Sequence, residues 1–243
     1  MLSTMLRNVE KRCAAEAGHE SPFGRGGARG GYVAGLGCLL RHTGRAGRFA
    51  AGTLLLVWAA GCGGGARLQP VTSESVVLAF GDSLTSGVGA EEEESYPAVL
   101  ARLLGCRVVN SGVAGEITRE GLARLPELLR RHRPQMVIIC FGGNDMLRKL
   151  NDEEIARNLR EMIRVVRQAE ADVVLLGVPQ PGLLLRAPPF YREIAEELDL
   201  VYEGVIVPRI LSTPSQKSDL IHPNADGYRR LAERLAKVIR QAS

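Results

Sequence analysis

Short apolar runs alternate with longer amphipathic stretches along the last two thirds of the chain. Five runs carry few charges and are typical of strands buried on both faces of a parallel sheet; they occupy residues 76–80, 107–109, 136–141, 172–177 and 200–202. Between and after them, apolar residues recur with the helical period, in residues 97–104, 118–131, 152–169, 190–197 and 225–241. Strands that alternate with helices predict a three-layer α/β domain, a parallel sheet with helices on both faces.

Local signals set some boundaries of the expected helices. Pro97 is favoured at a helix start and Gly105 at a helix end. Pro126 lacks a backbone N–H, so we expect it to interrupt the helix over 118–131. The four glutamates of residues 91–94 indicate a solvated loop.

The first quarter of the chain differs in composition from the rest. Residues 1–61 contain eight Lys or Arg and three Asp or Glu, whereas the remainder contains 23 and 24. The formal net charge of +4 therefore comes from this segment and gives no support for a nucleic-acid-binding domain. Residues 1–40 lack a sustained apolar period, which predicts disorder. The apolar run 49–60 is too short to span a bilayer and has the length of a signal-peptide core.

Residues 59–62 (Ala-Ala-Gly-Cys) resemble the lipobox of bacterial lipoproteins. The resemblance implies that Cys62 is acylated and becomes the new N-terminus, so that the protein is exported and faces the periplasm or the cell surface on a membrane anchor. Gly63 favours the outer membrane by analogy with lipoprotein sorting. The alternatives are an ordinary cleaved signal peptide and an uncleaved anchor with a free Cys62.

The domain organisation follows from these segments. We expect a disordered extension with a signal peptide in residues 1–61, a flexible tether in residues 62–74, and one catalytic domain in residues 75–243. The five cysteines show no pair with metal or redox spacing, so no metal site is expected; they are Cys13, Cys38, Cys62, Cys106 and Cys140.

Three turns that follow three of the predicted strands carry unusual small or polar residues, namely Ser83, Gly115 and Asn144. Because the carboxyl ends of parallel strands share one edge of a sheet, we expect these residues to converge. Ser83 alone fits two roles, a nucleophile or a cap of the next helix. Turns need glycine, but they do not need this serine and this asparagine, which favours a chemical role for the set.

A nucleophilic serine needs a base, and two histidines follow Cys62. His132 belongs to a cationic cluster at the end of a predicted helix and is not expected to be functional. His222 lies three residues after Asp219, a spacing that lets the carboxylate orient the imidazole ring. A surface turn capped by Asp219 is the alternative, but with Ser83 as a partner the catalytic interpretation is favoured.

Four segments, in this order, resemble the motif blocks of the SGNH (GDSL) hydrolase family. They are residues 81–84 (Gly-Asp-Ser-Leu), Gly115, residues 142–145 (Gly-Gly-Asn-Asp) and residues 219–222 (Asp-Leu-Ile-His). The resemblance covers residues 76–241 and looks most similar to bacterial arylesterases and to the thioesterase and lysophospholipase branch. It implies a flavodoxin-like sheet of five parallel strands.

The same resemblance implies roles for the motif residues. Ser83, His222 and Asp219 match the catalytic triad, and Ser83, Gly115 and Asn144 match the oxyanion hole. The expected function is a serine esterase of the arylesterase, acyl thioesterase or lysophospholipase type. It hydrolyses a small-molecule carboxylic ester or thioester through an acyl-enzyme, without a metal or a cofactor. The alternatives are a carbohydrate O-deacetylase of the same family and a lipoprotein that binds acyl chains or glycans without turnover.

Two apolar segments bear on the substrate. Residues 146–150 and 183–190 flank the ends of predicted strands. Their side chains either line an acyl groove or belong to the core under the loops, and the sequence leaves both interpretations open.

Overall fold

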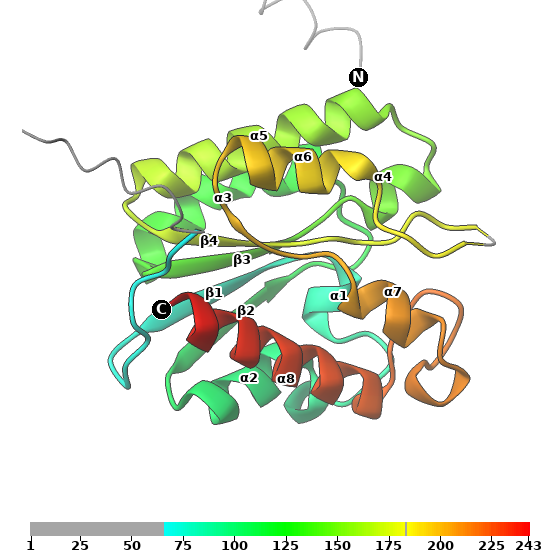
Figure 1. Ribbon diagram of the computed structural model, residues 1–243, viewed down its shortest axis with the longest axis horizontal. Coiled ribbons are helices and arrows are strands. Elements are labelled where there is room, and N and C mark those ends of the chain that lie inside the picture. The colour runs from blue at the N-terminus through cyan, green and yellow to red at the C-terminus, as the bar shows by residue number, and fades with distance from the viewer. Residues whose placement is uncertain (1–65, 183) are drawn as a thin grey trace, which may run out of the picture. The chain divides into compact units, whose positions relative to one another are not determined.

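The computed structural model describes residues 66–182 and 184–243 (Figure 1). The expected extension and signal peptide of residues 1–61, and the expected acylation of Cys62, lie outside the described residues and stay predictions. Within the expected tether, Leu68 is buried and its N–H donates to the carbonyl of Ala242 (2.8 Å). Packing against the domain therefore begins by Leu68 rather than at residue 75.

The sheet has five parallel strands, which confirms the predicted fold class. The strands are β1 (Val76–Gly81), β2 (Arg107–Gly112), β3 (Met136–Cys140), β4 (Asp172–Leu176) and β5 (Val201–Glu203). Their order is β2-β1-β3-β4-β5. In the register, Gly81 is paired with Gly112 on one side and with Cys140 on the other, so β1, β2 and β3 end level with one another. The turns that follow these strands consequently lie at one edge.

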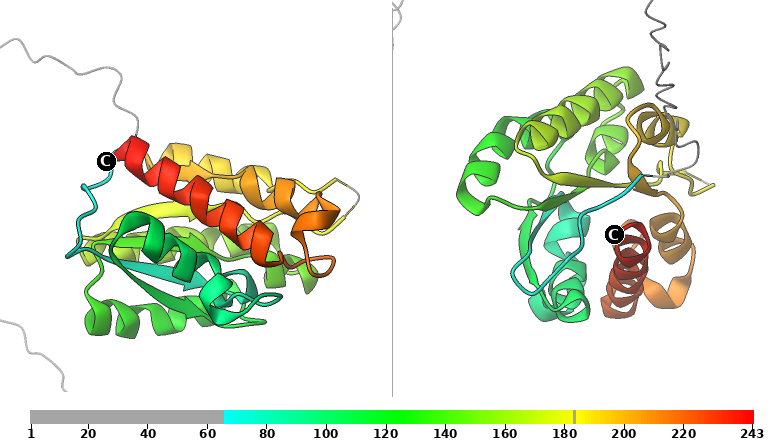
Figure 2. Two further views of the ribbon diagram at one scale, coloured as in Figure 1. Left: turned by 90° about the horizontal axis from the view of Figure 1, so that it is seen from below. Right: turned by 60° about the vertical axis from the view of Figure 1, so that its left-hand side comes forward.

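Two layers of helices cover the sheet (Figures 1 and 2). One layer contains α3 (Thr118–His132), α5 (Asp152–Gln168) and α6 (Pro189–Glu197), and the other contains α2 (Tyr96–Leu104) and α8 (Ala225–Ala242). The helix α7 (Ile206–Leu211) packs against α8. Short elements follow the strands or join the helices: α1 (Ser83–Ser86), η1 (Glu92–Glu94), α4 (Gly143–Leu147) and η2 (Pro214–Gln216). The glutamates expected in a loop thus form a 3-10 turn.

The helix α3 continues through Pro126, so the expected interruption is wrong. Pro126 itself is exposed, whereas Leu125 and Leu129 of the same helix are buried. Burying such side chains stabilises by about 1.5–3 kcal/mol each, which offsets the cost of about 3 kcal/mol for an internal proline. Close packing of α3 also needs Gly121, since a Cβ there would lie 2.5 Å from the ring of Phe141.

The amino-terminal and carboxyl-terminal edges of the sheet, where the parallel strands begin and end, carry different residues. The chain enters at the amino-terminal edge, where the N–H of Gln69 donates to Asp172 at the start of β4 (2.6 Å). His132 ends α3 at this same edge. None of the helices in the described part of the chain is long and apolar enough to cross a membrane. The candidate residues lie at the opposite, carboxyl-terminal edge.

Candidate active site

Ser83 is the first residue of α1, directly after β1. The cap of this helix is Asp82, whose carboxylate accepts a hydrogen bond from the N–H of Leu84 (3.0 Å). The strand can turn into the helix this tightly because Gly81 has no side chain; a Cβ there would lie 2.1 Å from the hydroxyl oxygen of Thr85. The sequence allowed Ser83 to be either a nucleophile or a helix cap. The structure shows that Asp82, and not Ser83, caps α1.

The Ser83 hydroxyl instead contacts His222. The Ser83 Oγ lies 3.0 Å from the His222 Nε2, and the His222 Nδ1 lies 2.7 Å from an oxygen of Asp219. The other oxygen of Asp219 accepts the backbone N–H groups of Ile221 and His222, each at 2.8 Å. The structure thus joins three residues that lie up to 139 positions apart in a single chain of hydrogen bonds.

The charge of Asp219 is stabilised by these contacts. Partial burial raises the pKa of this carboxyl, but the hydrogen bonds from the His222 ring and from the two backbone N–H groups outweigh it. The pKa of Asp219 therefore lies below its usual value. An ionised Asp219 holds the proton of the ring on Nδ1, which leaves Nε2 free to accept a proton from Ser83.

The backbone N–H groups of Ser83 and Gly115 are not used by the described part of the fold. Among the described residues, neither the N–H of Ser83 nor that of Gly115 donates a hydrogen bond to the protein. Gly115 adopts a φ of 81°, in the left-handed region that favours glycine. Its loop is attached to the end of β1, because the N–H of Val113 donates to the carbonyl of Gly81 (3.0 Å).

Asn144 lines the same pocket as Ser83 and His222. It lies at the start of α4, after the buried strand β3. Its side-chain amide donates to the carbonyl of Glu116 (3.0 Å) and to the carboxyl of Asp82 (3.3 Å). The structure therefore brings Ser83, His222, Asp219 and Asn144 together, and it places Gly115 in the adjoining loop rather than in the lining of the pocket.

An ion pair that the sequence did not indicate fixes the loop after β2. The guanidinium of Arg124, on α3, binds Glu116 with two hydrogen bonds (2.7 and 2.6 Å) and donates to the carbonyl of Ser111 (2.8 Å). It also stacks 4.6 Å from the centre of the Phe80 ring. Glu116 is the residue whose carbonyl holds Asn144. A charged residue on a helix usually faces solvent, so no local signal distinguishes Arg124.

Asp82 and Asp145 are both buried carboxyl groups beside the site. Asp145 accepts the backbone N–H (3.0 Å) and the hydroxyl (2.6 Å) of Thr118, which holds the start of α3. Burial is the main cause that raises the pKa of Asp82, from its usual value near 3.8 to about 7. The charges of Asp145 and Glu116 raise it further, against the lowering effect of the N–H of Leu84.

The raised pKa of Asp82 predicts how stability depends on pH. Because the folded pKa exceeds the unfolded one, the folded chain binds more protons between about pH 4 and pH 7, and its stability falls as the pH rises through that window. We expect the free energy of unfolding in urea to fall between pH 5 and pH 8 by on the order of 2–3 kcal/mol more in the wild type than in Asp82→Asn. Equal pH slopes in the two proteins would contradict the assignment.

The pocket at Ser83 is small and largely apolar. Its volume is about 50 Å³, and its walls are formed mainly by leucine, isoleucine, valine and proline side chains: Leu84, Leu147, Val178, Pro179, Pro181, Leu185, Leu211, Leu220 and Ile221. Leu147 and Leu185 come from the two segments considered for an acyl groove, whereas Met146 and Phe190 of those segments belong to the core. The core interpretation is thus confirmed for Met146 and Phe190, whereas an acyl groove at Leu147 and Leu185 stays a prediction.

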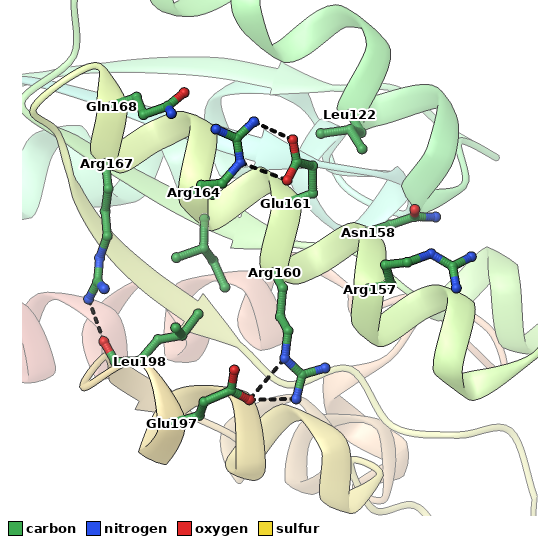
Figure 3. A pocket seen from close by; sticks show the side chains of 11 residues that line it. Leu122, Arg157, Asn158, Arg160, Glu161, Arg164, Arg167, Gln168, Glu197 and Leu198 are labelled. Carbon is green, nitrogen blue, oxygen red and sulfur yellow. Dashed lines mark hydrogen bonds and ion pairs between the residues drawn. The ribbon is translucent and has the colours of Figure 1, made fainter. Parts of the chain in front are cut away.

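A second cavity is larger but lies elsewhere. It has a volume of about 770 Å³ and is lined by residues of α3, α5 and α6 (Figure 3). None of its lining residues belongs to the hydrogen-bonded chain of Ser83, His222 and Asp219. The small pocket, and not this groove, is therefore the candidate for chemistry.

The chain is similar to known proteins in sequence and in fold. Residues 79–230 match the model of the GDSL-like Lipase/Acylhydrolase family. Thioesterase 1/protease 1/lysophospholipase L1 of Escherichia coli (strain K12) is 31% identical over 169 residues, which are 66% of this chain and 81% of that protein. An arylesterase of Vibrio mimicus is 30% identical over 179 residues, covering 66% and 86%. A crystal structure of TesA superposes with a TM-score of 0.61 at 27% identity, covering 70% of this chain and all of that one.

Proposed function

This chain belongs to the GDSL-like lipase/acylhydrolase family and is an esterase, and we propose that Ser83, His222 and Asp219 form its catalytic triad. The membership confirms the resemblance that the four motif segments indicated. The observation that carries the proposal is the chain of hydrogen bonds from Asp219 through His222 to Ser83, at 2.7 and 3.0 Å. These are the distances over which a base can take the proton of a nucleophile.

The mechanism follows from the roles of these atoms. The Ser83 Oγ attacks the carbonyl carbon of an ester or thioester while the His222 Nε2 takes its proton. The resulting imidazolium is stabilised by Asp219 and then gives its proton to the leaving alcohol or thiol, so that an acyl-enzyme forms. Water, activated by His222, attacks the acyl-enzyme and releases the acid.

The negative oxygen of the tetrahedral intermediate needs hydrogen-bond donors. We assign them to the backbone N–H groups of Ser83 and Gly115, which have no acceptor among the described residues, and to the side-chain amide of Asn144. The long bond of 3.3 Å from Asn144 to Asp82 supports this assignment, because a weakly held N–H can turn to a better acceptor. A single donor of this kind contributes on the order of 100- to 1,000-fold in rate.

The size and lining of the pocket bear on the substrate. A volume of 50 Å³ holds about three to four water molecules, which suits a short acyl or an aryl group close to Ser83. The apolar walls favour acyl or aryl groups over sugars. We therefore propose aryl esters and short acyl esters or thioesters as substrates, in line with the names of the thioesterase and arylesterase relatives.

Covalent labelling tests the triad and the substrate class together. A fluorophosphonate probe is expected to modify one serine, and mass spectrometry of the digested protein is expected to find it on Ser83. A series of p-nitrophenyl and thioester substrates from acetyl to palmitoyl is expected to give the highest kcat/KM for the short chains. An unlabelled protein, or a label on another serine, would overturn the triad.

We also propose that the protein is exported and held on a membrane by acylation of Cys62. Its lipobox-like residues 59–62 support this proposal, as does the entry of the described chain at the edge of the sheet opposite Ser83. An anchor there would leave the catalytic pocket open to the aqueous compartment. The expected result is recovery in the detergent phase with a lipid on Cys62; a soluble, unacylated product would refute the proposal.

A further inference from the structure

A pocket rich in arginine adjoins the catalytic pocket. Its volume is about 510 Å³, and it shares Leu185 with the pocket at Ser83. Arg186, Arg192 and Arg209 line it together with the aromatic ring of Tyr202. We call it the arginine pocket.

The three arginines that line this pocket come from three different elements. Arg186 belongs to the loop between β4 and α6, Arg192 to α6, and Arg209 to α7. In residues 66–182 and 184–243, the side chains of these arginines form no ion pair and donate no hydrogen bond to the protein. No Asp or Glu is among the lining residues. Three arginines therefore line one pocket whose lining contains no carboxylate to compensate their charge.

The carboxylate that follows the lining residue Tyr202 in the chain does not neutralise them. Glu203 lies between Tyr202 and Gly204, but its side chain is buried and forms an ion pair with Arg234 of α8. It also accepts the backbone N–H groups of Val205 and Ile206 (2.8 and 3.0 Å). Its negative charge is thus already engaged.

The groove along α5 provides a contrast within the same molecule (Figure 3). It also contains several arginines, but most of them bind the protein itself. Arg160 pairs with Glu197 (2.7 Å), Arg164 pairs with Glu161 (2.5 Å), and Arg167 donates to the carbonyl of Leu198 (2.5 Å). The arginine pocket, by contrast, combines arginines that form no ion pair within the described residues with a position next to the pocket at Ser83.

We propose that the arginine pocket binds a phosphate group on the alcohol or thiol part of the substrate. This inference rests on the proposed function, because it places the acyl part at Ser83 and the leaving group across Leu185. The planar guanidinium group presents paired N–H donors that match phosphate oxygens, and such charge-assisted bonds are stronger than neutral ones. A phosphate bound there lies away from the reacting carbonyl.

Binding at a distance from the reacting atoms predicts which kinetic constant changes. A contact that is equally strong in the ground state and in the transition state lowers KM without raising kcat. The arginine pocket should therefore act on KM, and the effect should weaken as the salt concentration rises.

The test compares substrates that share one acyl group. Butyryl-coenzyme A and butyryl-glycerophosphate carry phosphate on the leaving group, and p-nitrophenyl butyrate does not. In the variant Arg186→Gln/Arg192→Gln/Arg209→Gln, we expect the ratio of kcat/KM between a phosphate-bearing ester and p-nitrophenyl butyrate to fall about 10- to 100-fold, mostly through KM. The control Arg157→Gln/Arg160→Gln/Arg164→Gln removes the same charge from the α5 groove and is expected to keep the wild-type ratio.

The possible outcomes distinguish a nucleotide from a glycerophosphate as the source of the phosphate. They also distinguish failure of the arginine pocket from failure of the proposed catalytic triad. If the ratio of kcat/KM falls only for butyryl-coenzyme A, the pocket binds a nucleotide-type leaving group. If it falls only for butyryl-glycerophosphate, the pocket binds a glycerophosphate-type leaving group. Unchanged ratios with active hydrolysis of p-nitrophenyl butyrate would overturn the arginine pocket and leave the esterase. Calorimetry on Ser83→Ala with adenosine 3′,5′-bisphosphate and with glycerol phosphate decides the pocket without turnover. Binding of either compound that is lost in the triple arginine variant supports the arginine pocket. If neither compound binds, the proposal is overturned.

Discussion

Replacement of Ser83 by alanine is expected to reduce kcat for p-nitrophenyl butyrate by about 10⁵-fold or more. The substitution removes the only atom that contacts the His222 Nε2 in the hydrogen-bonded chain of the site. Without it, His222 and Asp219 have no nucleophile to activate, and the acyl-enzyme cannot form. The remaining rate would come from substrate binding and from the donors around the oxyanion.

The fold should survive this substitution. Asp82, and not Ser83, caps α1 through the N–H of Leu84, so the helix keeps its start. Stability in urea is the check on the fold. The matched control is Ser86→Ala in the same short helix, whose hydroxyl donates to the backbone carbonyl of Ser83 (3.1 Å) and is not part of the hydrogen bonds that join Ser83, His222 and Asp219. We expect this control to keep most of the activity. If Ser83→Ala retained more than a tenth of kcat, another nucleophile would have to be sought.

The strands and the convergence of the site were predictable because both depend on local patterns. A buried parallel strand needs an unbroken apolar run, and residues 76–80 and 136–141 provide one. Parallel strands end at a common edge, so the turns that contain Ser83 and Asn144 had to be neighbours once the strands were recognised. The spacing of Asp219 and His222 is short enough for direct contact, which the structure shows at 2.7 Å.

Contacts between distant helices and loops could not be predicted in the same way. Arg124 lies on a helix whose charged residues mostly face solvent, and only the tertiary fold shows that it binds Glu116. The continuity of α3 through Pro126 also depends on packing, because the buried face of that helix outweighs a local penalty. The arginine pocket is assembled by three elements whose sequences share no motif.

The Arg124–Glu116 pair suggests how the fold supports the chemistry. Arg124 ties the loop after β2 to the carbonyl of Ser111, and the carbonyl of Glu116 in that loop holds the amide of Asn144. The donors proposed for the oxyanion therefore depend on a helix on one face of the sheet, whereas the proposed base, His222, precedes a helix on the other face. The site thus lies at the carboxyl-terminal edge of the sheet, where residues from both helix layers come together.

The variant Asp219→Asn is expected to lower kcat by about 10⁴-fold with a small effect on KM. The reason lies in the two roles of this carboxylate. One oxygen accepts two backbone N–H groups and the other accepts the ring proton of His222. The asparagine oxygen must keep the two backbone donors, so its NH₂ group faces the His222 Nδ1. That nitrogen then becomes an acceptor, and the ring proton moves to Nε2.

A proton on Nε2 makes His222 a donor towards Ser83 and removes the base. The fold should be unaffected, because the amide oxygen still satisfies both N–H groups of the turn. Nitrogen NMR of His222 measures the tautomer directly and should show the proton on Nε2 in the variant and on Nδ1 in the wild type. Asp226→Asn is the matched control, since Asp226 pairs with Arg229 and Arg230 at the start of α8. A variant Asp219→Asn that kept a tenth of kcat would show that Asp219 does not set the tautomer.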